Sequence, residues 1–275
     1  MSIKLIKDQK IDKIKGALYG FAIGDAMGAT TEFMSDVQIK GKYYKLTDII
    51  GGGWLNLKAG EVTDDTQMTM CVIKAVMNSN DSDKFVNNCA NNFSNWLNSG
   101  PKDVGGQCSR AIKFYQKCNE LIEEDESALG NGSLMRALPC ALINNLNWNM
   151  LQNDITHPNA TCRRIIKAYH ENIVNLINGE NYMLNSFKLE IQSGHVENTF
   201  NNAIYWANKF SFSECIIGAV NHGGDADTIA AIAGSLSGAR FGFKNIPERW
   251  IKQLDEEVKK SLNNFVNYIY NCIVL

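Results

Sequence analysis

The sequence predicts an all-α protein, and three observations support this fold class. Apolar residues recur every three to four positions along most of the 275 residues, which is the spacing of one helix face. Convincing alternation of apolar and polar residues, the mark of a half-buried strand, does not occur. Only four prolines interrupt the chain, and no low-complexity linker divides it. We therefore expect one compact multi-helix domain spanning residues 1–275.

The expected helices begin near the N-terminus, where Ile11, Ile14, Leu18 and Phe21 lie on one face. A third apolar pattern, over residues 83–97, stops at Gly100-Pro101, which is a typical helix end. A second pattern, between these two, consists of Met68, Val72, Ala75 and Val76. Further patterns with the same spacing cover residues 106–118, 133–144, 160–177, 212–220, 228–241 and 247–270.

Two of these helices are unusually rich in small residues. Gly16, Gly20, Gly24 and Gly28 recur in the first, and residues 230–238 contain alanine, glycine and serine. Glycine inside a helix costs up to about 1 kcal/mol relative to alanine, so its presence requires a reason. Close approach of two buried helices is the favoured explanation, and a ligand pressed against the backbone is the other.

Composition excludes several functional classes. The net charge is −2 and the pI is about 6.1, so no basic surface indicates nucleic-acid binding. The longest apolar runs fall short of the roughly 20 residues that a membrane span needs, and residues 1–20 contain no signal-peptide core. The eight cysteines are scattered without metal-ligand spacing, which is typical of a reducing compartment. We expect a cytoplasmic protein that binds neither nucleic acid nor membrane.

Two short acidic clusters carry the strongest functional signal. They are Thr63-Asp64-Asp65-Thr66 and Gly224-Asp225-Ala226-Asp227-Thr228, and a helical pattern follows each one. Adjacent carboxylates repel one another in a poorly solvated site unless a cation lies between them. Their oxygens suit hard cations such as Mg²⁺, Mn²⁺ or Ca²⁺. Helix capping is the alternative for each cluster, and it is compatible with metal binding because a helix start is a rigid platform.

Other polar residues stand in glycine-rich segments. Glu32 follows a glycine-rich helix end, and Asp103 lies in a loop punctuated by Gly100, Gly105 and Gly106. For a lone glutamate, a solvated surface position is the competing interpretation.

The segment Gly130-Asn131-Gly132-Ser133 precedes a predicted helix, so its backbone N–H groups could cradle a phosphate. The same segment could be a plain turn with a helix cap. His157 also opens a helical pattern, where a histidine is more often a cap than a ligand.

Taken together and in this order, these segments resemble the ADP-ribosylglycohydrolase family, the type that includes dinitrogenase-reductase-activating glycohydrolase. The motifs that carry the resemblance extend from about residue 14 to residue 242. The resemblance implies an all-α fold around a central cleft that holds two Mg²⁺ or Mn²⁺ ions. The implied metal ligands are Thr63, Asp64, Asp65, Asp225, Asp227 and Thr228.

The resemblance also implies roles for residues outside the two acidic clusters. Glu32 would position or activate water or gate the cleft, and Asp103 would lie near the bond that is broken. Asn131, Gly132, Ser133 and Met135 would form the diphosphate loop, and His157 would face the ligand. The implied reaction is hydrolysis of the bond between ADP-ribose and a modified side chain, with ADP-ribosylarginine favoured. The partner would be an ADP-ribosylated protein or another ADP-ribose conjugate, and we expect a monomer.

Two alternatives to this hydrolase remain open. One is a catalytically silent ADP-ribose-binding or structural module of the same fold. The other is a binuclear-metal hydrolase that acts on a phosphoester. The products distinguish the two hydrolases, because release of free ADP-ribose indicates the ADP-ribosyl hydrolase and cleaved diphosphate or released phosphate indicates the phosphoester hydrolase.

Overall fold

The computed structural model describes residues 3–180 and 188–274, and this part of the chain is helical without strands. The all-α prediction is confirmed. The α-helices are α1 (Ile3–Gly28), α2 (Asp36–Tyr43), α3 (Asp64–Met77), α4 (Ser82–Asn98), α5 (Gly106–Cys118), α6 (Leu138–Leu142), α7 (Leu146–Asp154), α8 (Ala160–Asn178), α9 (Val196–Ala207), α10 (Phe212–His222), α11 (Ala226–Phe241), α12 (Glu248–Gln253) and α13 (Glu256–Val274). Two short 3₁₀ turns, η1 (Leu134–Arg136) and η2 (Phe243–Asn245), complete the set.

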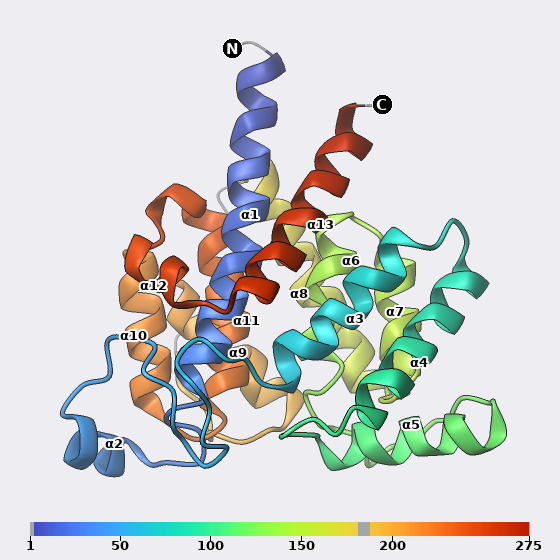
Figure 1. The fold of residues 1–275 in the computed structure, drawn as a ribbon, viewed down its shortest axis with the longest axis horizontal. Coiled ribbons are helices and arrows are strands. Elements are labelled where there is room, and N and C mark those ends of the chain that lie inside the picture. Colours follow the sequence, from blue (N-terminus) through green and yellow to red (C-terminus); the bar gives the residue numbers. More distant parts are fainter. Residues whose placement is uncertain (1–2, 181–187, 275) are drawn as a thin grey trace.

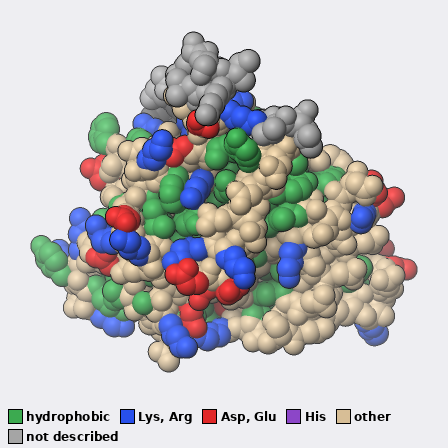
Figure 2. All heavy atoms as spheres, turned by 45° about the horizontal axis from the view of Figure 1, so that its top comes forward, with side chains coloured by type: hydrophobic (Ala, Val, Ile, Leu, Met, Phe, Trp, Pro, Cys, Tyr) green, Lys and Arg blue, Asp and Glu red, His purple; other side chains and the backbone are tan. Residues whose placement is uncertain are grey.

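Helices α1 and α11 form the centre of the molecule. In Figure 1, α3 to α7 lie on one side of this pair and α10 and α12 on the other. The buried apolar residues of one continuous cluster come from all of these groups. Acidic and basic side chains are mixed on the face drawn in Figure 2, where neither sign forms an extended patch. Among the described residues, no helix is both long and apolar enough to cross a membrane.

The glycines of α1 allow it to touch α11 backbone to backbone. A Cβ on Gly24 would overlap the carbonyl oxygen of Ala230, and one on Gly28 would overlap that of Ala226. Because α1 numbers rise as α11 numbers fall along the contact, the two helices are antiparallel. Close helix approach is therefore the reason for the small residues. It brings the end of α1 beside the start of α11.

The structure corrects several predicted helices. The segment 133–144 is not one helix, because η1 ends before Pro139, whose ring cannot continue an upstream helix. The segment 247–270 divides at Leu254, which is extended, and the Asp255 carboxylate caps a new helix at Glu257 and Val258. Helices α2, α7 and α9 were not predicted at all.

Candidate functional site

The end of α1 and the start of α11 bring Glu32 close to the second acidic cluster. The chain leaves α1 and pairs with the turn before α11, because Phe33 N–H donates to the Gly224 carbonyl at 2.7 Å and Gly224 N–H donates to Met34 at 2.9 Å. Gly223 and Gly224 both have positive φ, of 81° and 66°, which favours glycine at this tight turn. Asp225 and Asp227 follow directly.

The first acidic cluster begins α3, and Asp25 of α1 holds it in place. The buried Asp25 carboxylate accepts hydrogen bonds from the Thr63 N–H at 3.0 Å, the Thr66 N–H at 3.0 Å and the Thr66 hydroxyl. The Thr63 hydroxyl accepts from Asp65 N–H at 3.3 Å, so it does cap the helix. Capping therefore orients the cluster, and Asp64 and Asp65 remain available to a ligand.

The two acidic clusters meet although they are far apart in the sequence. The Thr228 hydroxyl lies 3.4 Å from both Asp65 Oδ1 and Asp225 Oδ1. The positive ends of the α3 and α11 dipoles both point at this junction, which favours negative charge there. Asp103 reaches the same place from the segment between α4 and α5, and Gly105 N–H approaches Asp64 at 3.4 Å.

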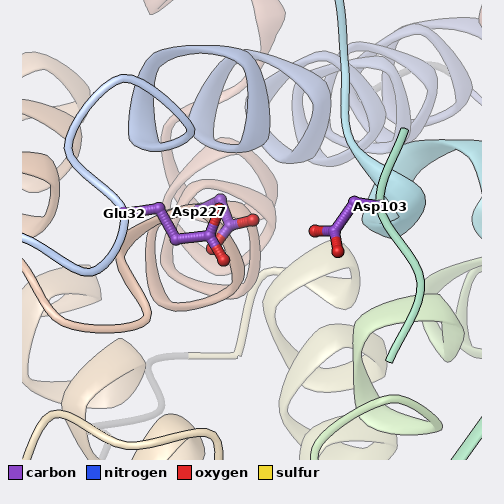
Figure 3. A group of neighbouring side chains, drawn as sticks. All are labelled: Glu32, Asp103 and Asp227. Carbon is purple, nitrogen blue, oxygen red and sulfur yellow. The ribbon is translucent and has the colours of Figure 1, made fainter. Parts of the chain in front are cut away.

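A cavity of about 300 Å³ opens at this junction. Figure 3 shows the carboxylates of Glu32 and Asp227 side by side, with that of Asp103 facing them from another segment. One oxygen from each of these three groups lies within 4.8 Å of the others. Six acids line the cavity: Glu32, Asp64, Asp65, Asp103, Asp225 and Asp227.

Burial makes these carboxyls reluctant to ionise. It raises the pKa of Glu32 to about 8, against the opposing effect of a hydrogen bond from the Trp54 indole at 2.6 Å. It also raises the pKa of Asp64 to about 8, with Asp103 adding to the effect. Burial and repulsion by Asp227 raise the pKa of Asp65 well above the usual carboxyl range, and burial and repulsion by Glu32 do the same for the pKa of Asp227.

Two buried oxygens of this cluster have no partner within the described part of the chain. They are Asp65 Oδ2 and Asp227 Oδ1. A buried carboxylate oxygen without a partner raises the free energy of the folded state. A hard cation would coordinate this oxygen and would also offset the repulsion among the carboxylates. The donor set of carboxylates and a threonine hydroxyl fits Mg²⁺ or Mn²⁺.

The predicted phosphate loop lines another part of the same cavity. Asn131, Gly132, Met135 and His157 all contribute to the lining. The Asn131 amide donates to Asp225 and, at 2.9 Å, to Thr199, which ties the loop to the acidic cluster. There is no room for a side chain at Gly132, because a Cβ there would lie 2.8 Å from Cys108 Sγ and 2.9 Å from His157.

The buried side chain of Arg136 holds this loop in place through hydrogen bonds. Its fully buried guanidinium donates to the Gly132 carbonyl at 2.9 Å and to the Thr156 hydroxyl at 2.6 Å. The Thr156 hydroxyl in turn lies 2.8 Å from Nδ1 of His157. Burial and the charge of Arg136 lower the pKa of His157 to about 3, so this imidazole is neutral near pH 7.

The structure gathers most of the predicted site residues but not all of them. Thr63 and Ser133 are buried and do not line the cavity. Sequence reasoning assigned no role to Asp25, which lies between Gly24 and Gly28, or to Arg136, which follows the segment Gly130-Asn131-Gly132-Ser133. It also assigned no role to Trp54, which follows Gly51-Gly52-Gly53 and whose indole N–H donates to Glu32. An aromatic residue directly after three glycines was the available signal.

A larger cavity, of about 770 Å³, lies between α3, α4 and α13. Its lining includes Gln67 and Trp96, which are hydrogen bonded to each other at 2.8 Å. Its acid Glu61 is paired with Lys102 at 2.8 Å and is partly exposed. No buried carboxyl cluster converges there in the described residues, so the smaller cavity is the candidate site.

Comparison with known proteins gives a consistent result. A protein-family model described as ADP-ribosylglycohydrolase matches residues 6–273. The chain is 34% identical to the ADP-ribosyl-[dinitrogen reductase] glycohydrolase of Rhodospirillum rubrum, over 93% of this chain and 95% of that protein. It is 30% identical to the ADP-ribosylarginine hydrolase Tri1 of Pseudomonas putida, over 91% and 76%. A solved structure titled "ADP-ribosylglycohydrolase-related protein complex" shares the fold, with a TM-score of 0.79 and 24% identity over 94% of this chain and 99% of that one.

Proposed function

Because this chain belongs to the ADP-ribosylglycohydrolase family, we propose that it hydrolyses the glycosidic bond between ADP-ribose and a modified protein side chain, with ADP-ribosylarginine favoured. The observation that carries this proposal is the meeting of two acidic clusters with a phosphate-type loop in one cavity. The arginine preference is supported by the name of one similar protein, the ADP-ribosylarginine hydrolase Tri1 of Pseudomonas putida. The absence of disulfides among the eight free cysteines agrees with action in the cytoplasm.

We assign the metal ligands to the two acidic clusters. Thr63, Asp64 and Asp65 on α3 and Asp225, Asp227 and Thr228 at the start of α11 would hold two Mg²⁺ or Mn²⁺ ions. When bound, such ions supply positive charge that polarises a water molecule and the ribose hydroxyls. The unpartnered oxygens of Asp65 and Asp227 support this assignment. The Thr63 hydroxyl also accepts the Asp65 N–H as the cap of α3.

Glu32 and Asp103 would divide the proton transfers between them. Glu32 is fixed by the Trp54 indole and lies beside Asp227, so it would position the attacking water and accept its proton. Asp103 is on a segment between two helices and faces the same point, so it would orient the leaving side chain. Asn131, Gly132, Ser133, Met135 and His157 would surround the diphosphate. The Gly132 N–H and the neutral His157 imidazole would be the donors, because the N–H groups of Asn131 and Met135 already donate to the carbonyls of Gly194 and Asn131.

Defined substrates test this proposal directly. We expect a peptide carrying ADP-ribosylarginine to release free ADP-ribose in the presence of Mg²⁺ or Mn²⁺, and the release to stop with EDTA. Asp227→Asn should lower turnover at least about 100-fold, because it removes an anionic ligand. The matched control is Asp83→Asn, an exposed acid in the first turn of α4, which should leave turnover unchanged.

The products also decide between the proposal and its alternatives. Cleaved diphosphate or free phosphate would show a phosphoester hydrolase. ADP-ribose binding without any turnover on arginine- or serine-linked peptides would show a silent binding module. Full turnover in EDTA would exclude the metal mechanism.

A further inference from the structure

We propose that Phe33 and Trp54 form an aromatic clamp at the mouth of the cavity, and that this clamp binds the positively charged guanidinium of the modified arginine. The inference rests on the proposed function, and it extends that function by assigning the residues that select the leaving side chain.

The rings of Phe33 and Trp54 are exposed to solvent, although aromatic side chains usually lie in protein cores or interfaces. Phe33 is 68% exposed and Trp54 is 53% exposed. Their ring centroids are 5.5 Å apart with a 45° tilt, so they present one joint apolar surface. Phe33 also lines the cavity, and Trp54 donates its indole N–H to Glu32. The clamp is therefore continuous with the acidic part of the site.

The backbone holds both rings firmly despite their exposure. Phe33 has a φ of 60°, which an aromatic residue rarely adopts, and its N–H bonds to the turn that precedes Asp225. Residue 53 packs directly on the end of α1, because a Cβ on Gly53 would overlap the Ala29 carbonyl oxygen. Tyr44 has the same φ of 60° but lies outside the cavity lining, so it is the position of Phe33 at the cavity, together with its fixed backbone, that indicates a binding role.

The position of the clamp identifies what it would bind. If the phosphate-type loop holds the diphosphate, the reacting sugar carbon lies among the acids, and the clamp beside Glu32 faces the group beyond the broken bond. A guanidinium stacks well on an aromatic face and is attracted to it. Glu32, which is hydrogen bonded to Trp54, and Asp103, which lies beside Glu32, would offer carboxyl oxygens that accept hydrogen bonds from the guanidinium. A neutral serine side chain would gain neither interaction.

The test compares Phe33→Asn with the matched variant Tyr44→Asn. Asparagine tolerates positive φ, so both variants should keep or raise the thermal midpoint. Tyr44 has the same φ of 60° and is 83% exposed, but it lies outside the cavity lining. We expect Phe33→Asn to lower kcat/KM for an ADP-ribosylarginine peptide about three- to tenfold, the range of a cation–π contact. Its Kd for free ADP-ribose and its kcat/KM for an ADP-ribosylserine peptide should change less than about twofold. Tyr44→Asn should match the wild type in all three.

Trp54 gives a second, independent variant. Trp54→Phe keeps a ring but removes the indole donor to Glu32, so it should keep more of the arginine preference than Trp54→Ala does.

Three results would overturn the inference. They are an unchanged arginine kcat/KM in Phe33→Asn, an equal loss on the serine peptide, and an equal loss of ADP-ribose affinity, since each removes the clamp's link to the guanidinium. Failure of the wild-type protein to release ADP-ribose from either peptide would instead overturn the proposed function itself.

Discussion

Asp25 and Asp65 are both fully buried carboxyls, and they differ in what satisfies them. Asp25 accepts hydrogen bonds from three groups at the start of α3. Asp65 leaves one oxygen without a partner among the described residues. Asp25 therefore stabilises the local structure at the start of α3, and Asp65 is available to a cation.

This difference predicts opposite effects of two similar substitutions in metal-free protein. Asp25→Asn should lower the free energy of unfolding by about 1–3 kcal/mol, because an amide cannot accept all the bonds that the carboxylate accepts. Asp65→Asn should leave it unchanged or raise it, because one of several repelling acids is removed. Urea unfolding of both variants in EDTA measures this. A large decrease in the free energy of unfolding in Asp65→Asn would show that the Asp65 carboxylate stabilises the fold instead.

The contacts of His157 predict which of its nitrogens carries the proton. The Thr156 hydroxyl accepts from Arg136, so its own proton is free for Nδ1 of His157. The neutral ring should therefore be protonated at Nε2, which would offer a donor to a phosphate oxygen. Nitrogen chemical shifts of the imidazole report the tautomer. Thr156→Val should weaken this preference and Thr156→Ser should preserve it, whereas a wild-type ring protonated at Nδ1 would refute the assignment.

His170 predicts part of the stability loss in acid. Burial lowers its pKa to about 4, and its Nδ1 already faces the amide donor of Asn149 at 3.1 Å. In the unfolded chain a histidine titrates near pH 6.5, so between about pH 6.5 and 4 only the unfolded state gains the proton, and stability falls as pH falls. His170→Gln should lose less stability than the wild type between pH 7 and pH 5 in urea unfolding. The pKa values of His157 and His222 are also lowered, so these two histidines should still cause part of the stability loss in the His170→Gln variant.

At the scale of elements, the antiparallel contact of α1 and α11 decides where the acids lie. The glycine spacing of α1 lets the helices touch through their backbones, and each helix end then delivers its acids to the same point. Spacing between these two helices is therefore coupled to the geometry of the site.

This coupling predicts different outcomes for two glycine-to-alanine substitutions in helices. Gly24→Ala should destabilise the protein by more than about 2 kcal/mol, because the methyl group would overlap Ala230 and force the helices apart. Gly41→Ala on α2 should stabilise it by up to about 1 kcal/mol, since nothing lies within 4 Å of the new Cβ. Thermal and urea unfolding compare the two. Equal effects would mean that α1 and α11 adjust without cost.

The sequence predicts elements well where one apolar face is long and undisturbed. The patterns of α4 and α8 show this, since each has a wide apolar stripe and a clear stop. The prediction is wrong over residues 247–270, because apolar periodicity continues past Leu254 while the Asp255 cap starts a new helix. Helix α9 was missed, since its start depends on His195, an unusual capping residue.

The acids of the two clusters could be singled out because they stand close together in the sequence, as Asp64 and Asp65 do, whereas Glu32 and Asp103 received their roles only from the family resemblance. Trp54 and Asp25 could not be assigned roles, because their partners lie at distant positions that only the fold brings close. A motif shows which residues have the right chemistry. Which of them share one cavity depends on helix packing, and periodicity does not contain that information.

At the scale of the whole molecule, helices from both ends of the sequence share one apolar core, and we propose that they form one domain. Heating should therefore give a single cooperative transition in EDTA. A divalent cation at 100 times its Kd would add about 2.7 kcal/mol, which is roughly 5 °C for a chain of this size. Calorimetry with Mg²⁺ and with Mn²⁺ tests both statements. Asp65→Asn should lose the shift, and two separate transitions would contradict the single domain.

The central pairing of α1 with α11 also governs what happens while the chain is being made. Residues of α1 leave the ribosome early, and their glycine face has no partner until α11 has emerged, near the end of synthesis. Contacts between such distant segments form slowly, because a long loop must close first. A nascent or truncated chain that stops before residue 224 contains Asp64 and Asp65 but has no second acidic cluster to place beside them. Hydrolytic competence would therefore arise in one step, late in translation, and incomplete chains would be inert.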